Sequence, residues 1–180
     1  LARLFGIDRV LSPATAREIY DACNAALATD AFTAQALMRR CNVRAVCTTD
    51  DPVDSLEYHR CIAESGFGTK VLPAWRPDKA TAVSDPEDYN AYLDRLEAAA
   101  DMSIGTYEEL LDALHVRHDF FDRMGCRLSD HGLGGFVAAD YTESELMQIF
   151  AKVRGGTALT AGETAKFQSG LLFDLALMDD

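Results

Sequence analysis

The chain has 180 residues, 48% of them hydrophobic, and its 29 acidic against 17 basic residues give a net charge of −12. This length suits one globular region with its own core, and no stretch approaches the ~20 continuous apolar residues that a membrane span needs. Such an acidic surface repels nucleic acid and anionic lipid, which leaves small molecules and proteins as the favoured partners.

Helix-start signals recur along the chain. A capping Ser, Thr or Asp is followed either by Pro or, three residues later, by Glu. In chain order these signals and the stop signals at Asn42, Gly66 and Gly125 predict helices over residues 13–28, 34–40, 55–64, 86–100, 107–124, 143–153 and 161–178. In the fifth of these an apolar stripe follows helical spacing. It consists of Tyr107, Leu110, Leu111, Leu114, His118 and Phe121.

Three short apolar segments between these helices predict strands. They are "VRAVCTT" (43–49), "TKVLPAW" (69–75) and "CRLSDHGL" (126–133), the last running into a loop. The first is nearly continuously apolar, so we expect a strand covered on both faces. Pro73 counts against the second, because proline removes a ladder donor. Strands that alternate with helices predict right-handed crossovers and a parallel sheet.

Polar side chains follow each predicted strand. They are Thr48, Thr49, Asp50 and Asp51 after the first, Arg76, Asp78 and Lys79 after the second, and Ser129, Asp130 and His131 after the third. Because the carboxyl ends of parallel strands lie at one edge of a sheet, we expect the three groups to converge there. Arg76 and Lys79 would then neutralise part of the acidic loop, leaving carboxylates for hydroxyl groups and a guanidinium for an anion.

Each group also has a structural interpretation. Asp50, Asp51 and Asp54 could cap the next helix. The turn over residues 76–78 could hold only a local ion pair. The Asp130-His131 pair could be structural, although an aspartate can also orient a histidine for metal binding or proton transfer.

The remaining histidines and the cysteines are expected to be structural. We expect His118 to pack in the core, His115 to be exposed, and His59 to lie at the surface or near a helix C-terminus. The odd number of cysteines and the lack of a C-x-x-C pair indicate no disulfide framework and no structural zinc site. We expect buried free thiols in a reducing cytoplasm, and because no basic region followed by an apolar segment appears after Leu1, we expect no signal peptide. The cysteines are Cys23, Cys41, Cys47, Cys61 and Cys126.

Several stretches together resemble one enzyme family. They are "FGID", "DACNAAL", "NVRAVCTTDDPVDSLEYH", "VLPAWRPDKA", "CRLSDHGL" and "KFQSGLLFDLALMD". Over essentially all 180 residues the chain resembles uronate isomerase (glucuronate isomerase) of the amidohydrolase superfamily. The resemblance implies a (β/α)₈ barrel that interconverts D-glucuronate with D-fructuronate and D-galacturonate with D-tagaturonate. In this aldose–ketose isomerisation a proton moves between C2 and C1 through an enediol.

The resemblance also implies substrate-binding residues. Arg76 would lie at the substrate end of the barrel and bind the carboxylate of a sugar acid. Asp50 and Asp51 would line the same mouth, and His131 would serve metal or substrate there. The resemblance implies one divalent metal, such as zinc, in full-length members, and it assigns no catalytic residue in this chain.

The sequence departs from the family pattern in its metal motif. It contains no H-x-H, and it ends before a late strand that would supply an aspartate and an arginine. A closed eight-stranded barrel needs roughly 250 residues. We therefore expect residues 1–180 to form a single α/β region, the middle part of a TIM-type barrel with about three parallel strands and extra helices. We expect this piece to bind no metal and to be inactive alone, and pairing with a second copy would cover its open sheet edges.

Two other functions remain open from the residues. A non-catalytic, receiver-like α/β interaction domain could hold Mg²⁺ at Asp50 and Asp51, although such modules need about five alternating strands. A metal-dependent hydrolase could use Asp130 and His131, but the missing H-x-H counts against it equally.

Overall fold

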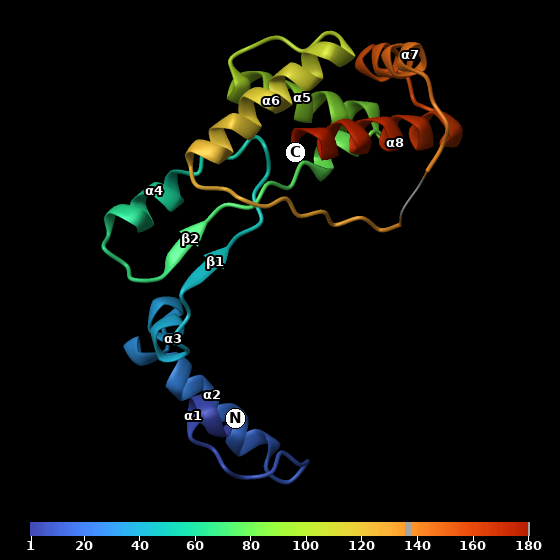
Figure 1. Ribbon diagram of the computed structural model, residues 1–180. Coiled ribbons are helices and arrows are strands. Elements are labelled where there is room, and N and C mark those ends of the chain that lie inside the picture. Colours follow the sequence, from blue (N-terminus) through green and yellow to red (C-terminus); the bar gives the residue numbers. More distant parts are fainter. Residues whose placement is uncertain (136–137, 180) are drawn as a thin grey trace. The chain divides into compact units, whose positions relative to one another are not determined.

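A computed structural model describes residues 1–135 and 138–179 of the chain (Figure 1). It contains short 3₁₀ helices, η1 and η2, besides α-helices and strands. In chain order the elements are α1 (Ala2–Phe5), α2 (Ala16–Leu27), η1 (Asp30–Phe32), α3 (Ala34–Arg40), β1 (Ala45–Cys47), α4 (Glu57–Glu64), β2 (Lys70–Leu72), η2 (Asp78–Thr81), α5 (Pro86–Ala100), α6 (Tyr107–Arg123), α7 (Glu143–Arg154) and α8 (Ala161–Met178). No helix in the described part of the chain is long and apolar enough to cross a membrane.

The chain groups into two compact units. One unit is Leu1–Val46 with Gly68–Lys70, and the other is Cys47–Phe67 with Val71–Asp180. In the first unit Ile19 is the only hydrophobic side chain among the described residues that is fully buried, so α1 to α3 share little core. The second unit contains the main core and all the predicted site residues.

The helix starts predicted from capping signals are confirmed for α3 and for α5 to α8, but α2 begins at Ala16 and not at Pro13. Thr106, Thr142 and Thr160 each form a capping box with the glutamate three residues later, at the starts of α6, α7 and α8. Asp85 accepts hydrogen bonds from two backbone amides at the start of α5. Asn42 has a positive φ of 55°, as expected for the residue that ends α3. Local hydrogen bonds therefore set these boundaries.

Helices α5 to α8 pack together and bury the core of the second unit (Figure 1). Aromatic rings fill its centre: Phe167 lies 5.8 Å from Tyr107 and 6.4 Å from Phe150, measured between ring centroids. The apolar stripe of α6 faces this core, with Leu110, Leu114 and Phe121 fully buried. Burying large apolar side chains on one face of each helix is the main source of stability here.

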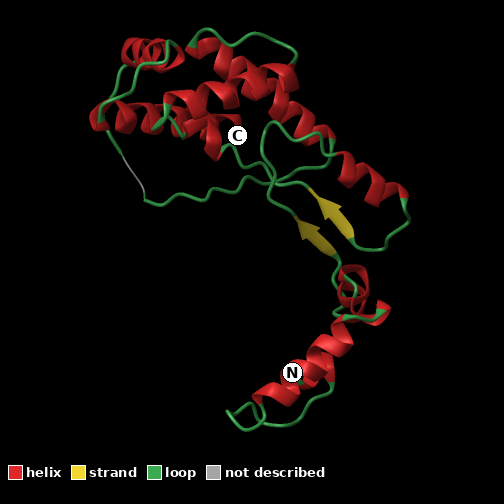
Figure 2. Ribbon diagram, turned by 180° about the vertical axis from the view of Figure 1, so that it is seen from behind, coloured by secondary structure: helices red, strands yellow, loops and turns green. Residues whose placement is uncertain are grey.

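The strands are parallel but shorter than predicted. Figure 2 shows β1 and β2 side by side with their arrows pointing the same way. β2 ends at Leu72, just before Pro73, yet the pairing continues: Ala74 and Arg76 donate to the first segment. In a parallel pair, alternate residues of one strand bond to the same neighbour, so Pro73 faces the other side and removes no bond to the β1 segment.

The third predicted strand forms only an isolated parallel bridge, between Trp75 and Ser129. Pro73 lies two residues before Trp75 on the side of the third segment, where its missing N–H removes a donor. The side chain of Arg127 instead donates to the carbonyl of Cys126. Pairing with the third segment therefore starts only at Leu128, whose carbonyl accepts from Trp75.

Two burial predictions are wrong. The first strand is not covered on both faces, because Ala45 and Cys47 are exposed and only Val46 between them is half-buried. The cysteines are all free, as expected, but Cys41, Cys47 and Cys61 are exposed and Cys126 alone is fully buried. A continuous apolar run indicates a strand, but it does not show what lies over each face.

Replacing Gly170 in α8 tests the packing of α8 on α7. A Cβ at Gly170 would overlap the buried side chain of Leu146, so we expect Gly170→Ala to lower the free energy of unfolding by about 1–3 kcal/mol. Gly162→Ala is the matched control, because a Cβ there meets nothing within 4 Å and alanine favours the helix. Trp75 is the only tryptophan, so its fluorescence during urea unfolding reports this unit. Equal stability of the two variants would contradict the packing.

Candidate functional site

The three predicted polar groups meet because backbone pairing joins the segments that carry them. Asp50 and Trp75 form a parallel bridge, and Trp75 and Ser129 form another. Trp75 N donates to Leu128 O at 3.1 Å, and Trp75 O accepts from Asp130 N at 2.8 Å. The carboxyl ends of the three segments therefore lie at one edge, as the sequence predicted.

We call the polar residues that follow the three segments the first, second and third tails. Side-chain contacts between these tails confirm that they converge. Arg76, from the second tail, forms an ion pair with Asp130 of the third. Thr49, from the first tail, donates to the same carboxylate oxygen at 3.2 Å. The Nε of Arg76 has no hydrogen-bond partner among the described residues and lies 3.9 Å from an oxygen of Asp78. Arg76 is therefore bound by the neighbouring tail, with one donor unused.

His131 is oriented by Asp78 and not by its sequence neighbour Asp130. Its Nδ1 lies 2.9 Å from Asp78 Oδ1, and the other oxygen of Asp78 accepts from the amide of Gly132 at 2.6 Å. Any side chain at Gly132 would crowd that carboxylate, since a Cβ would lie 3.3 Å from it. The imidazole is thereby fixed by one nitrogen, which leaves Nε2 without a partner among residues 1–135 and 138–179.

The acidic loop, which we define as residues 50–54, does not cap the next helix. Helix α4 begins after Leu56 without a side-chain cap. Instead, Asp54 accepts from the amide of Asp51 at 2.8 Å, and Asp51 accepts from the amide of Val53 at 3.1 Å. The other oxygen of Asp51 lies 3.1 Å from Lys79 Nζ, so the expected neutralisation by that lysine is present.

Tyr92, from α5, lies near Asp51. Its side chain is 3% exposed, and burial raises its pKa well above the usual range, with the negative charge of Asp51 raising it further. The phenol therefore stays protonated. The neutral phenol therefore adds no charge next to Asp51, and Lys79 is the cation paired with that carboxylate.

Asp50 is held by a small network that includes His59. Thr48 Oγ1 donates to Asp50 Oδ2 at 2.6 Å, and the amide of Ala74 donates to the same oxygen at 3.2 Å. His59 Nε2 lies 2.8 Å from the Thr48 hydroxyl and 3.8 Å from Asp50 Oδ1. Because that hydroxyl gives its one proton to the carboxylate, it must accept from His59, so Nε2 carries a proton.

The prediction for His59 is therefore wrong. Its side chain is only 11% exposed, and it sits in the first turn of α4, where it points back to the strand ends. Its Nδ1 is buried with no partner among the described residues. The only sequence signal for this position was that His59 is the third residue of α4, in the turn closest to the preceding strand. The positive φ of Leu56, which sets the direction of that turn, could not be foreseen.

A hollow of about 320 Å³ opens at this edge, and we call it the strand-edge hollow. It is lined by Thr49, Asp50, Asp51, Asp54, Arg76, Asp78 and Lys79. Three of the four predicted site residues, Asp50, Asp51 and Arg76, line it directly. His131 does not line it and adjoins it only through Asp78.

Exposure within the hollow differs between cations and acids. The Lys79 and Arg76 side chains are 58% and 35% exposed. The Asp50 and Asp51 side chains are each 12% exposed. A small molecule that enters from solvent would therefore meet the two cations before these two carboxylates, although acids outnumber bases in the lining.

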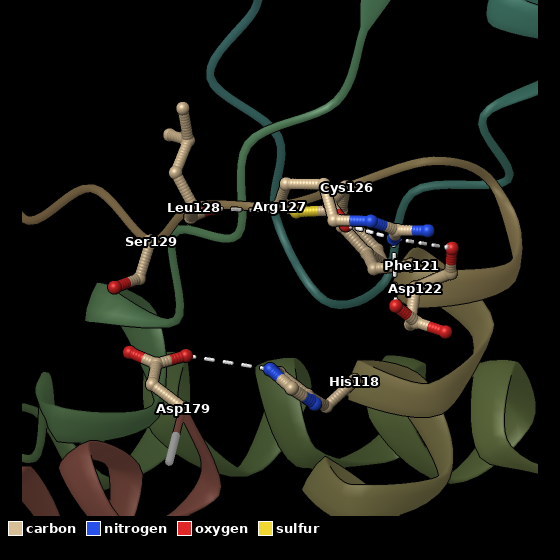
Figure 3. A pocket seen from close by; sticks show the side chains of 8 residues that line it. All are labelled: His118, Phe121, Asp122, Cys126, Arg127, Leu128, Ser129 and Asp179. Carbon is tan, nitrogen blue, oxygen red and sulfur yellow. Dashed lines mark hydrogen bonds and ion pairs between the residues drawn. The ribbon is translucent and has the colours of Figure 1, made fainter.

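Ser129 belongs to a different hollow, of about 500 Å³ (Figure 3). Successive residues of an extended segment point to opposite sides, which separates Ser129 from Asp130. His118 also lines this second hollow, where its Nε2 lies 3.3 Å from Asp179 and its ring packs edge-on against Trp75. The expected core position of His118 is thus only partly right, because 26% of its side chain is exposed; His115 is exposed, as expected.

The described residues do not fit a metal site of their own. No three side chains of His, Cys, Asp or Glu within residues 1–135 and 138–179 come together in a way that could hold a metal ion. At the strand edge the carboxylates are instead bonded to Lys79, Arg76 and His131.

Comparisons with known proteins agree on one family. The sequence model of the family described as glucuronate isomerase matches residues 1–180. The chain is 53% identical over 179 residues to the uronate isomerase of Bacteroides thetaiotaomicron and 50% identical over 181 residues to that of Cellvibrio japonicus, covering 99% of this chain in each case. It spans only 38% of the length of either relative.

Two crystal structures have the same fold over nearly the whole chain. The uronate isomerase of Thermotoga maritima matches with a TM-score of 0.88 and 32% identity, over 99% of this chain and 39% of the other. The glucuronate isomerase of Caulobacter crescentus matches with a TM-score of 0.86 and 31% identity, over 98% of this chain and 36% of the other.

Replacing His59 tests the network around Asp50. In His59→Leu the Thr48 hydroxyl loses its donor in a buried site, and we expect the free energy of unfolding to fall by about 1–3 kcal/mol. His115→Leu, at an exposed position of α6, should change stability by less than about 0.5 kcal/mol. Urea unfolding followed by Trp75 fluorescence compares the two. A loss no larger for His59→Leu than for the control would show that the network contributes nothing.

Proposed function

The chain belongs to the glucuronate isomerase family, and from this premise we propose that its strand-edge hollow binds a sugar acid as part of an aldose–ketose isomerase. In that reaction D-glucuronate is converted to D-fructuronate, or D-galacturonate to D-tagaturonate, by moving a proton from C2 to C1. The observation that carries the proposal is the convergence of Asp51, Arg76 and Asp130 from three parallel segments on one edge.

We infer that the parallel segments are the middle part of a (β/α)₈ barrel. Neighbouring segments in order along the chain pair in parallel, and polar residues occupy their carboxyl ends, where barrel enzymes place their sites. The close match to two longer uronate isomerase structures supports this inference. The chain spans 38% of its curated relatives, so turnover is proposed for a polypeptide of their length and not for residues 1–180 alone.

The carboxylate of the substrate would be bound by the two exposed cations of the hollow. Arg76 is attached to Asp130 through Nη2, its side chain is 35% exposed, and a planar guanidinium can bind a carboxylate through two parallel hydrogen bonds. Lys79 adds a point charge that can leave Asp51, since it is more than half exposed. Against a net charge of −12, this local pair is what permits an anion to bind.

The hydroxyl groups of the sugar would be bound by carboxylates and by His131. Asp50 and Asp51 line the hollow, and carboxylate oxygens accept from hydroxyl groups. Asp78 holds His131 by Nδ1, so Nε2 is the nitrogen available to a hydroxyl group at this edge. Because one oxygen of Asp50 already accepts two bonds, the role of Asp50 is the more structural of the two acids.

The proposal contains no step through a metal. The divalent ion that the resemblance implies would need ligands beyond the described residues, because these do not assemble a site for it.

The five free cysteines fit a reducing compartment, which supports the cytoplasm as the place of action. No observation favours the receiver-like module, which would need about five alternating strands, or the hydrolase, in which Asp130 would have to orient His131.

Arg76→Met tests the carboxylate site. Binding of D-glucuronate to residues 1–180 should change the fluorescence of the adjacent Trp75, and D-glucuronamide, which lacks the charge, should bind more weakly. Arg76→Met should weaken D-glucuronate binding by about 10–100-fold, because a charge-assisted hydrogen bond contributes ~1.5–3 kcal/mol. Arg60→Met, on the exposed surface of α4, removes the same charge as a control.

A chimera tests the reaction. Residues 1–180 replace the matching segment of the Bacteroides thetaiotaomicron uronate isomerase, and the conversion of D-glucuronate is measured. We expect turnover in the chimera and a loss in kcat/KM with Arg76→Met that matches the loss in binding. An active chimera whose kcat/KM is unaffected by Arg76→Met would refute the role of Arg76 and the sugar-acid hollow with it.

A further inference from the structure

Arg117 is the only charged side chain among the described residues that is fully buried, at 8% exposure. It lies in α6 three residues after Leu114 and four before Phe121, at an apolar position of the helical stripe. Its guanidinium packs on the ring of Phe120, with 4.2 Å from Cζ to the centroid. A buried charge is costly unless its donors are bonded, so the partners of Arg117 show what it does.

Those partners are backbone carbonyls, two of them in the acidic loop. Nε donates to Pro52 O at 2.6 Å, and Nη2 donates to Asp54 O at 2.8 Å. Nη1 donates to Ala99 O near the end of α5 at 3.0 Å. No carboxylate of the described residues forms an ion pair with Arg117, and burial lowers its pKa, although the charge of Asp54 opposes this. Arg117 therefore joins the loop to two core helices.

The bonded carbonyls flank Val53 and lie one and three residues after Asp51, the site residue of this loop. The loop makes three internal bonds: Val53 N and Asp54 N donate to the carboxylate and the carbonyl of Asp51, and Asp51 N donates to the Asp54 carboxylate. By binding both carbonyls, Arg117 fixes the backbone that makes these internal bonds. This backbone holds the Asp51 carboxylate 3.1 Å from Lys79 Nζ at the strand-edge hollow.

We propose that Arg117 is a positioning residue of the candidate site: it holds the acidic loop from the core side so that Asp51 keeps its place beside Lys79. It touches no ligand. The effect on sugar-acid affinity rests on the proposed function, but the effect on the loop does not. Lysine cannot replace it, because one ammonium cannot reach three carbonyls that lie in different directions, whereas the guanidinium has donors in a fixed fork.

The test is amide hydrogen exchange in the 180-residue protein with Arg117→Lys. We expect exchange of the Asp51 and Val53 amides to rise at least about tenfold, as the loss of one charge-assisted hydrogen bond implies, while amides in the middle of α7 change less than about threefold. Arg123→Lys, an exposed arginine of the same helix, is the control and should leave all of these rates unchanged. A uniform rise across the second unit would show that Arg117 only stabilises the core and would overturn the proposal, as would unchanged exchange in the loop.

A second measurement needs no variant. In the unsubstituted protein, exchange of the Arg117 Nε–H should follow that of the Asp51 and Val53 amides when urea is raised, because opening the loop frees all three. An Nε–H that exchanges only with global unfolding, while the loop amides exchange earlier, would also overturn the proposal.

Binding of D-glucuronate separates this inference from the proposed function. If the unsubstituted protein binds it, Arg117→Lys should weaken binding by about threefold to tenfold, because Asp51 is displaced while Arg76 stays. If the unsubstituted protein binds no D-glucuronate, the proposed function fails, and the exchange results alone still decide whether Arg117 positions the loop. Unchanged affinity combined with a disordered loop would remove Asp51 from the ligand contacts and overturn the positioning role.

Discussion

The backbone hydrogen bonds of Trp75 are the interaction on which the rest of the candidate site depends. Its N–H donates to the third segment and its carbonyl accepts from it, while its neighbours Ala74 and Arg76 bond to the first segment. Its ring is 1% exposed and packs edge-on against Phe121 in the core. One residue thus ties the strand ends to the helices, and because the pairing is parallel, the three polar tails share an edge. Every contact in the candidate site follows from that arrangement.

The electrostatic design of the edge follows from how these tails pair with one another. Arg76, Lys79 and His131 are each bonded to an aspartate of another tail or of the same turn. The pairs cancel most of the local charge and leave the cations nearer to solvent than the carboxylates of Asp50 and Asp51. A very acidic protein can in this way offer an anion-binding hollow, and a sugar acid is the ligand that we propose for it.

What the sequence could predict depends on how local the cause is. The capping boxes at Thr106, Thr142 and Thr160 lie within four residues, and all three form as expected. The shared edge follows from strand order alone, so it too was predictable.

The roles of His59 and Arg117 could not be predicted. The role of His59 depends on the positive φ of Leu56, and the role of Arg117 depends on carbonyls about 65 residues away. The third strand was predicted too long because Pro73, on the side that faces it, has no N–H to donate, so pairing there starts only at Leu128. The assignment of Ser129 to the site ignored the alternation of side chains along an extended segment.

The central claim is that the tails after Thr49, Trp75 and Leu128 are joined in parallel, and it can be measured by NMR. Scalar couplings across hydrogen bonds in the uniformly ¹⁵N- and ¹³C-labelled protein report each bond separately. The structure predicts couplings from Trp75 N to the Leu128 carbonyl carbon, from Asp130 N to the Trp75 carbonyl carbon, and from Asp50 N to the Ala74 carbonyl carbon. If these three are missing while the helical couplings of α7 are seen in the same spectrum, the tails are not joined and the shared edge does not exist.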